Sequence, residues 1–174
     1  MSSSSGMTFN IFLSHSVEDY SIVSKIEEEL KDKEIEVYIA EKDIQPGTSL
    51  AEKVRSNIEK CNLFIALITK NGRRSEWIQT EIGIALEAKK RIVPILEEGT
   101  NIPKPLKDLE YVELKLNDIE HSIDSLKAFL NKFKASVKKS LTKRLIGKIV
   151  LVLSAIIIIA VLASVFSDDK KRRW

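Results

Sequence analysis

The chain has 174 residues and a formal net charge of +3, and because globular domains mostly contain about 100–150 residues, this length leaves room for one domain and one appendage. Residues 1–121 contain 16 Lys and Arg against 22 Asp and Glu, a net charge of −6, whereas residues 122–174 contain 12 against 3, a net charge of +9. The acidic part has no basic patch interleaved with aromatic residues, which argues against nucleic-acid binding, and the basic part suits a lipid bilayer with anionic headgroups better than nucleic acid.

Short apolar runs alternate with helical patterns along the first 135 residues, after a polar leader at 1–7 that does not resemble a signal peptide. Strands are predicted at 9–13, 35–39, 63–68, 92–96 and 112–114, and helices at 19–31, 50–60, 76–90 and 119–133. Ser49 and Glu52 form a capping box for the second helix, and Ser75 is the expected N-cap of the third. This alternation predicts an α/β domain with a parallel sheet covered on both faces.

Residues 149–166, IVLVLSAIIIIAVLASVF, contain no charge and only two serines as polar side chains. As a helix they would extend over about 27 Å, close to the roughly 30 Å hydrocarbon core of a bilayer. A buried core helix is the alternative, but the position after a basic run favours a single membrane span. Residues 136–148 then form a basic juxtamembrane segment and 167–174 a short charged tail. More positive charge precedes the span than follows it, so the positive-inside rule predicts a C-terminal anchor with the domain in the cytoplasm.

Cysteine and histidine are scarce in this chain. Cys61 is the single cysteine, so no intrachain disulfide is possible, which agrees with a reducing compartment. His15 and His121 are too few and too far apart in sequence to indicate a metal site.

The stretch Ser75–Lys90 contains a carboxylate where a helix would be apolar. At about 100° per residue, Glu81 falls in the apolar arc, with Trp77 one turn before it and Ala85 one turn after it. A half-buried, ionised glutamate is costly unless something pairs with it. Spacing alone leaves two interpretations open. Glu81 either holds or cleaves a cationic or hydroxyl-rich ligand beside an aromatic wall, or it lies at the edge of the face and pairs with an Arg or Lys.

The parallel sheet predicts where a ligand would bind. In such sheets ligands gather beyond the carboxyl ends of the strands, which are here 14–16, 40–47, 69–74 and 97–100. The helix that carries Glu81 starts directly after the third of these ends, so Glu81 is expected near the cleft. No GxGxxG or GxxxxGK sequence occurs, which disfavours a Rossmann-type dinucleotide fold and a P-loop enzyme.

Three motifs occur in register over the predicted elements: FLSHSVED (Phe12–Asp19), AEKDIQPGTSL (Ala40–Leu50) and SEWIQTEIGIAL (Ser75–Leu86). In this order and spacing the chain resembles a Toll/interleukin-1 receptor (TIR) domain of the bacterial and archaeal branch, over residues 8–135. The resemblance implies a flavodoxin-like, five-stranded parallel sheet flanked by helices, to which this chain would add one C-terminal transmembrane helix.

Many members of this family cleave NAD at the nicotinamide–ribose bond, so the resemblance implies NAD as the substrate, with no cofactor and no metal. Glu81 matches the catalytic glutamate of the family within its Trp-x-x-x-Glu stretch. Trp77 would shape the pocket or stack on an aromatic ring, with plain packing as the alternative. Phe12, Ser14 and His15 match the first motif, whose loop lies near the nucleotide in the family.

The resemblance also concerns the loops around this site. Asp43 and Gly47 match the loop after the second strand, which in relatives closes over the substrate and makes inter-domain contacts. Asp43 could touch the ribose or cap a turn, Gly47 serves the backbone conformation, and Ser75 either lines the site or only caps its helix. Ser16 is expected to cap the helix that follows the first strand. The chain departs from the family pattern at Glu41, where aspartate is common.

Two functions follow as alternatives. The first is a membrane-anchored NAD nucleosidase that yields nicotinamide and ADP-ribose or a cyclic ADP-ribose signal, activated by self-association with other TIR domains, in signalling or antiviral defence. The second is a catalytically silent scaffold that binds similar domains. A phospho-receiver is disfavoured because Ser14–His15 stand where it would have an acidic pair and Thr69–Lys70 where it would have an aspartate. The span as a membrane-perturbing effector has little support, because it contains no charge.

Overall fold

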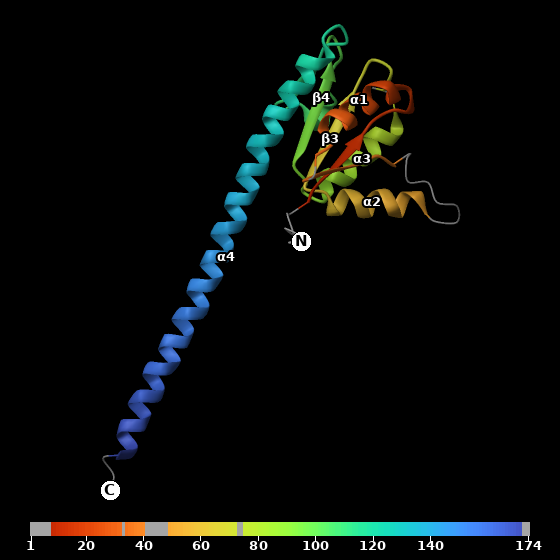
Figure 1. The fold of residues 1–174 in the computed structure, drawn as a ribbon. Helices are drawn as coiled ribbons and strands as arrows, with labels where there is room; N and C mark the ends of the chain where they lie inside the picture. Colours follow the sequence, from red (N-terminus) through yellow and green to blue (C-terminus); the bar gives the residue numbers. More distant parts are fainter. Residues whose placement is uncertain (1–7, 33, 41–48, 73–74, 172–174) are drawn as a thin grey trace, which may run out of the picture. The chain divides into compact units, whose positions relative to one another are not determined.

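The computed structural model describes residues 8–32, 34–40, 49–72 and 75–171 (Figure 1). Side chains are described up to position 143, and beyond it at positions 146, 149 and 151. The predicted leader at 1–7 and the predicted loop residues Glu41, Asp43 and Gly47 lie outside the described residues.

A five-stranded parallel sheet forms the centre of the domain, as the sequence predicts (Figure 1). Its strands are β1 (Phe9–Ser14), β2 (Ile35–Tyr38), β3 (Leu63–Ile68), β4 (Ile92–Glu97) and β5 (Val112–Leu114). Their order is β2-β1-β3-β4-β5, and all neighbouring pairs run parallel. This is the order of flavodoxin-like sheets.

The hydrophobic pattern of each strand agrees with its place in the sheet. Every residue of β3 and β4 is buried, as expected for strands covered on both faces. The edge strand β2 is only partly buried. Within the core, the ring of Phe12 stacks on that of Phe64 with centroids 5.4 Å apart and an interplanar angle of 8°.

The helices start within one residue of the predicted positions, although the third ends before residue 90 and the fourth continues past residue 133. They are α1 (Tyr20–Leu30), α2 (Leu50–Lys60), α3 (Glu76–Glu87) and α4 (Ile119–Lys171), with short 3-10 helices η1 (Val17–Asp19) and η4 (Lys104–Leu106). Ser49 caps α2 as predicted, because its Oγ accepts a hydrogen bond from the Glu52 N–H at 3.3 Å. The turn η4 lies in a loop for which the sequence predicts no helix.

Parallel crossovers are right-handed, which decides the face that each helix covers. The chain moves through α1 from β1 to β2 in one direction, and through α2 and α3 toward β4 in the other, so α1 covers the face opposite to α2 and α3. Ion pairs join neighbours within these layers: Arg55 of α2 contacts Glu87 of α3 at 3.1 Å, and Lys127 of α4 contacts Glu29 of α1. The direction of the crossovers reverses between β1 and β3, and this switch point is where flavodoxin-like folds bind ligands.

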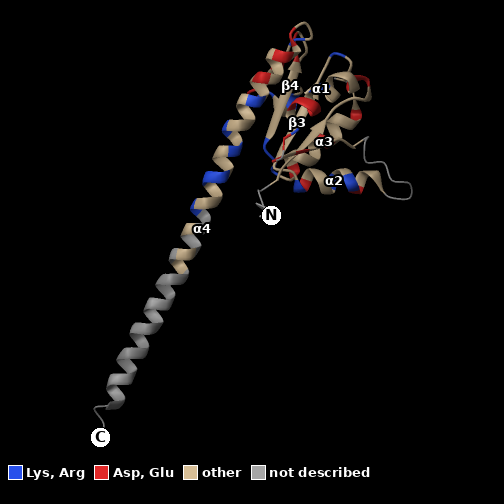
Figure 2. Cartoon of the chain, in the orientation of Figure 1, with Lys and Arg blue, Asp and Glu red and all other residues tan. Residues whose placement is uncertain are grey.

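The predicted membrane anchor, and with it the predicted membrane localisation, is contradicted. The chain divides into two units, residues 1–129 and 130–174, and α4 continues through the second. Among the described residues no helix is long and apolar enough to cross a bilayer. Lysines recur along the described part of α4 (Figure 2) and interrupt any apolar window there; they are Lys127, Lys132, Lys134, Lys138, Lys139 and Lys143. The side chains at 152–166, within the predicted span, lie outside the described residues.

Candidate functional site

Helix α3 carries the buried glutamate that the sequence predicts. Ser75 starts the helix, because its Oγ accepts a hydrogen bond from the Ile78 N–H at 3.4 Å, which confirms it as the N-cap. Glu81 is 2% exposed and shares the buried face of α3 with Ile78, Ile82 and Ala85. The carboxylate therefore lies deeper than the half-buried position expected from spacing.

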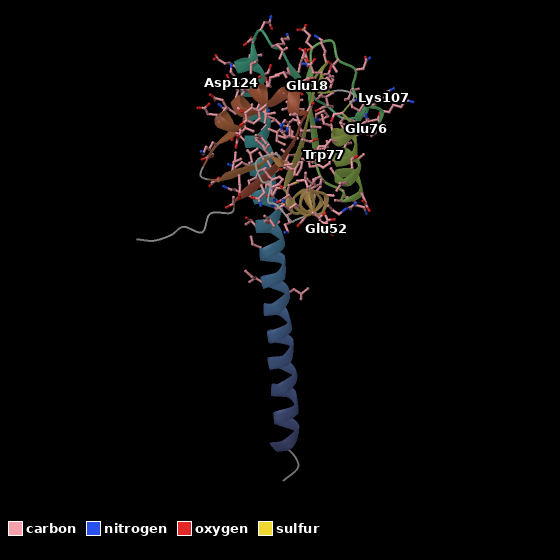
Figure 3. All side chains as sticks on the ribbon, turned by 90° about the vertical axis from the view of Figure 1, so that its right-hand side faces the viewer. Glu18, Glu52, Glu76, Trp77, Lys107 and Asp124 are labelled. Atoms are coloured by element: carbon pink, nitrogen blue, oxygen red, sulfur yellow. The ribbon has the colours of Figure 1, made fainter. Side chains whose placement is uncertain are left out.

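Trp77 lies on the first turn of the same helix but not on its buried face. Its side chain is 40% exposed, and Figure 3 labels it on α3 beside the exposed Glu76. The apolar arc predicted from spacing places Trp77 inward, so the structure differs at this position. A partly exposed indole leaves part of its surface open to stack on a ligand, whereas a fully packed ring would not.

The end of β1 contributes three of the predicted site residues. Phe12 is fully buried between the rings of Phe64 and Tyr38, which gives it a packing role, and its contact with substrate stays a prediction. Ser14 is buried, and its hydroxyl makes no hydrogen bond to any described residue. His15 is also buried, with Nδ1 3.4 Å from the carbonyl oxygen of Leu13.

A buried polar cluster of Asp19, Thr69 and Gly72, which the sequence does not predict, lies at the switch point. Asp19 is 2% exposed. The Thr69 hydroxyl donates to the Asp19 carboxylate, with Oγ1 2.9 and 3.0 Å from its two oxygens, and accepts the N–H of Gly72 at 2.8 Å. Thr69 follows β3 directly and Asp19 follows β1, so their contact joins the two strands at which the crossover direction reverses.

Burial raises the pKa of the Asp19 carboxyl, because desolvation disfavours its charged form. The hydrogen bond from Thr69, the nearby His15 and a backbone hydrogen bond involving Ser16 oppose this rise in pKa, whereas the nearby Glu97 adds to it. Ser16 itself does not act as the predicted side-chain cap: it precedes η1, but its side chain makes no capping hydrogen bond.

A second buried carboxylate, that of Glu97, contacts the connection between β3 and α3. Glu97, the buried last residue of β4, accepts the backbone N–H of Lys70 at 2.8 Å and lies 3.2 Å from the Lys70 ammonium. The β3–α3 connection is thus fixed at two successive residues, Thr69 and Lys70. The sequence shows Asp19 only as an ordinary first residue of a helix and Glu97 only as a strand end, so a buried contact between loops leaves no sequence signal.

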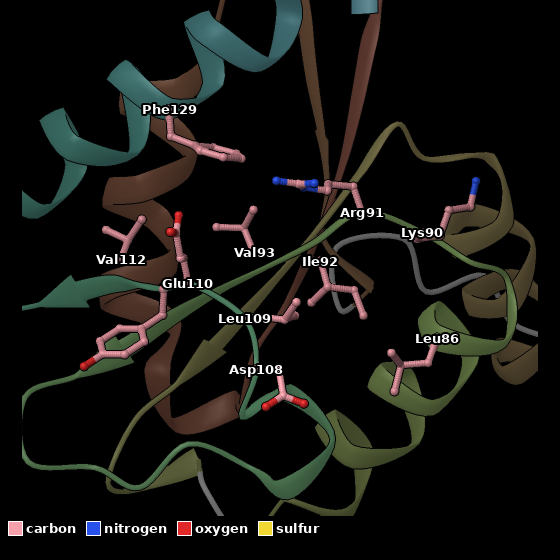
Figure 4. A pocket seen from close by; sticks show the side chains of 11 residues that line it. Leu86, Lys90, Arg91, Ile92, Val93, Asp108, Leu109, Glu110, Val112 and Phe129 are labelled. Atoms are coloured by element: carbon pink, nitrogen blue, oxygen red, sulfur yellow. The ribbon is translucent and has the colours of Figure 1, made fainter. Parts of the chain in front are cut away.

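Two larger pockets are lined by described residues. One, of about 550 Å³, lies between Gln79 and Ile82 of α3 and residues 101–105, and Glu81 does not line it. The other, of about 510 Å³, lies at the amino ends of β4 and β5, away from the strand ends that carry Asp19 and Thr69 (Figure 4). Among the described residues, no group of three or more His, Cys, Asp or Glu side chains is placed to hold a metal ion.

Known proteins share the sequence features and the fold described above. The family model described as "TIR domain" matches residues 11–127. The TIR domain of the Toll-related receptor TRR-2 from Hydra magnipapillata has a TM-score of 0.60 and 20% identity, covering 73% of this chain and 99% of that one. The CMP N-glycosidase BcmB from Clostridium botulinum has a TM-score of 0.54 and 21% identity, covering 69% of this chain and 98% of that one.

A third similar structure is the TIR-STING receptor from C. gigas, solved in complex with 2′,3′-cGAMP. It has a TM-score of 0.56 and 23% identity, and the match covers 68% of this chain and 39% of that one. At these identities the likeness concerns the fold alone. No curated protein matches this sequence.

Proposed function

The chain belongs to the TIR-domain family, and from that premise we propose that it cleaves NAD at the nicotinamide–ribose bond, with Glu81 as the catalytic carboxylate. The observation that carries this proposal is the burial of Glu81 on an otherwise apolar helix face directly after β3. A buried carboxylate stabilises a positive charge that develops beside it in a transition state far more than an exposed carboxylate does, because little water screens the interaction.

The chemistry requires little more than one such carboxylate. Nicotinamide leaves NAD as a neutral ring from a cationic glycoside, so the leaving group needs no general acid. The transition state resembles an oxocarbenium ion, which a carboxylate stabilises electrostatically or through the ribose hydroxyls. Attack by water then gives ADP-ribose, and attack by a second group of the same molecule gives a cyclic ADP-ribose. In this scheme the partly exposed Trp77 stacks on an aromatic ring of the substrate, and Ser14 and His15 lie near the nucleotide.

One similar structure supports the class of chemistry. The name CMP N-glycosidase describes cleavage of a bond between a base and a sugar, which is the class of bond that joins nicotinamide to ribose. This likeness supports the proposal only by showing that the fold is compatible with such a reaction. TIR domains commonly self-associate, and we propose that assembly of this chain activates it in signalling or defence.

Glu81→Gln tests the catalytic assignment. The amide keeps the shape of the side chain and removes its charge, so turnover of NAD should fall by at least about 100-fold, the scale of one lost electrostatic contact to a transition state. Glu76→Gln is the matched control, because Glu76 is exposed five residues earlier on the same helix and its substitution should leave turnover unchanged. NAD consumption and its products are measured at high protein concentration, with self-association followed in the same sample. Equal turnover by Glu81→Gln and wild type would refute the assignment.

A catalytically silent scaffold is the second candidate function. It is favoured by exposed apolar side chains that line the pocket at the amino ends of β4 and β5, among them Tyr111, which is 51% exposed, Leu109 and Leu86. Exposed apolar groups of this kind are typical of protein interaction surfaces. If wild type and Glu81→Gln both leave NAD intact while the protein assembles, the scaffold is the better account.

A further inference from the structure

A chain of hydrogen bonds leads from Asp19, at the start of α1, to the first turn of α3. The Asp19 carboxylate accepts from Thr69 Oγ1, and Thr69 Oγ1 accepts from the Gly72 N–H. The Gly72 carbonyl then accepts the Ser75 N–H at 2.9 Å, and Ser75 Oγ accepts the Ile78 N–H. Each hydrogen bond starts at the residue where the previous one ends. This series of bonds through Asp19, Thr69, Gly72, Ser75 and Ile78, called the relay below, connects the switch point to the helix that carries Trp77 and Glu81.

We propose that Asp19 and Thr69 are positioning residues for the Glu81 site: their buried hydrogen bond fixes the β3–α3 connection and thereby the place of α3. The proposal deepens the NAD-cleaving function and rests on it for its catalytic consequence. Neither residue is assigned a contact with substrate. They act through Gly72 and Ser75, which set where the first turn of α3 starts.

The atoms around Gly72 are closely packed against Asp19 and Thr69. A Cβ at Gly72 would lie 2.9 Å from Asp19 Oδ2, 2.9 Å from Ser16 Cβ and 3.2 Å from Thr69 Oγ1, so only glycine fits at this position without displacing its neighbours. The backbone of the loop therefore approaches the carboxylate as closely as it can. Gly72 therefore has no room to move toward Asp19, and movement away from it would break the hydrogen bond from the Gly72 N–H to Thr69 Oγ1.

The position of Asp19 in its own element supports the same role. Aspartate before a helix ordinarily accepts hydrogen bonds from the first N–H groups of that helix. Asp19 occupies the N-cap position of α1, yet its side chain makes no capping hydrogen bond and instead contacts Thr69. The chain thus forgoes a stabilising cap and buries a charge, both of which cost stability, and a contact kept at such a cost is typical of functional sites.

Thr69→Val and Thr69→Ser form the test, measured on the full chain. Valine keeps the shape but removes the hydroxyl, and the expected result is a kcat lower by about tenfold with KM within about twofold, because a displaced catalytic group costs turnover more than substrate binding. Serine keeps the hydroxyl and should restore kcat. Ser122→Ala is the matched control: Ser122 Oγ is buried and links the Lys115 N–H to the Asp118 carbonyl at another junction between a loop and a helix, so its loss should leave kcat unchanged.

Amide hydrogen exchange gives a second readout that does not depend on activity. In Thr69→Val the Gly72 and Ile78 amides should exchange at least about tenfold faster than in wild type, and Thr69→Ser should restore both. Faster exchange at Gly72 alone would overturn the proposal, since the relay would then end before α3. If Thr69→Val does not fold, Asp19→Ala, which removes the acceptor of the Thr69 hydroxyl, carries the same test.

The outcomes separate this proposal from the proposed function. Loss of kcat by Thr69→Ser equal to that of Thr69→Val, or an equal loss by Ser122→Ala, would show general destabilisation and overturn the positioning role. If the wild-type chain cleaves no NAD, that result contradicts the proposed function but leaves the positioning role open to test. The exchange of Gly72 and Ile78 then decides whether Asp19 and Thr69 position α3.

Discussion

Asp19 is a side chain that folding removes almost completely from water, and its burial has a cost that depends on pH. Burial raises the pKa of its carboxyl above the ordinary value of 3.8, because the charged form loses hydration that the hydrogen bonds involving Thr69 and the Ser16 backbone replace only in part. His15, from the end of β1, favours the charged form, whereas Glu97, from the end of β4, disfavours it. The folded protein therefore binds a proton at Asp19 more readily than the unfolded chain does.

This difference predicts how Asp19→Asn changes stability. Because the pKa in the folded state is the higher one, the stability contributed by Asp19 is present below pH 3.8 and is lost as the pH rises through the raised pKa. Asparagine does not titrate, so the free energy of unfolding of Asp19→Asn minus that of wild type should increase over this range and then level off. The increase is about 1.4 kcal/mol for each unit by which the pKa is raised. Urea titrations between about pH 4 and 8 measure it, and a difference that stays constant or decreases with pH would contradict the prediction.

Glu81 and Asp19 show which buried carboxylates a sequence can reveal. Glu81 is predictable because it interrupts the apolar side of a regular helix, and periodicity locates it without any knowledge of its neighbours. Asp19 stands at the start of a helix, where aspartate is common, so its sequence position carries no signal. Its partner Thr69 is 50 residues away, and only the fold brings the two together.

At the scale of elements, strands and helices follow from hydrophobic pattern, whereas helix ends depend on backbone details. The predicted bounds of α2 and β3 agree with the structure residue by residue, because caps and apolar runs define both ends. The predicted third helix continues to Lys90, but α3 ends at Glu87. The chain leaves the helix through Lys89, which has a left-handed φ of 52°. Glycine is the usual residue in this conformation, and without one the sequence gives no stop signal.

The end of α3 provides a stability prediction. Lys89→Gly should raise the free energy of unfolding by about 0.5–1 kcal/mol, because glycine adopts a left-handed φ without the strain that a Cβ causes there. Lys31→Gly is the matched control: Lys31 follows α1 with a φ of −63°, so glycine relieves no strain and should lower stability by a similar amount. Urea denaturation measures both variants. A loss of stability in Lys89→Gly would show that the left-handed residue is not strained.

At the scale of the whole molecule, the proposed boundaries of the TIR domain, residues 8–135, depend on where its core ends. The family model stops at residue 127, whereas α4 starts at Ile119 and continues to Lys171, so the helix itself marks no boundary. Its first turns still belong to the core, since Ile123 and Leu126 are buried. The sequence predicts this apolar spacing, and it also indicates that the helix continues past residue 133, because Val137 and Leu141 keep the same period and neither glycine nor proline occurs near residue 135.

Truncation tests these boundaries. A chain that ends at Ser136 keeps Ile123 and Leu126 and should unfold in one cooperative urea transition. A chain that ends at Asp118 loses both, and because each buried aliphatic side chain contributes about 2–5 kcal/mol of a total stability of about 5–15 kcal/mol, it should not fold. Circular dichroism across a urea series distinguishes the two chains. Failure of the longer chain to unfold cooperatively would place the boundary of the domain beyond residue 136, whereas a folded shorter chain would show that the sheet, α1, α2 and α3 form a sufficient core without α4.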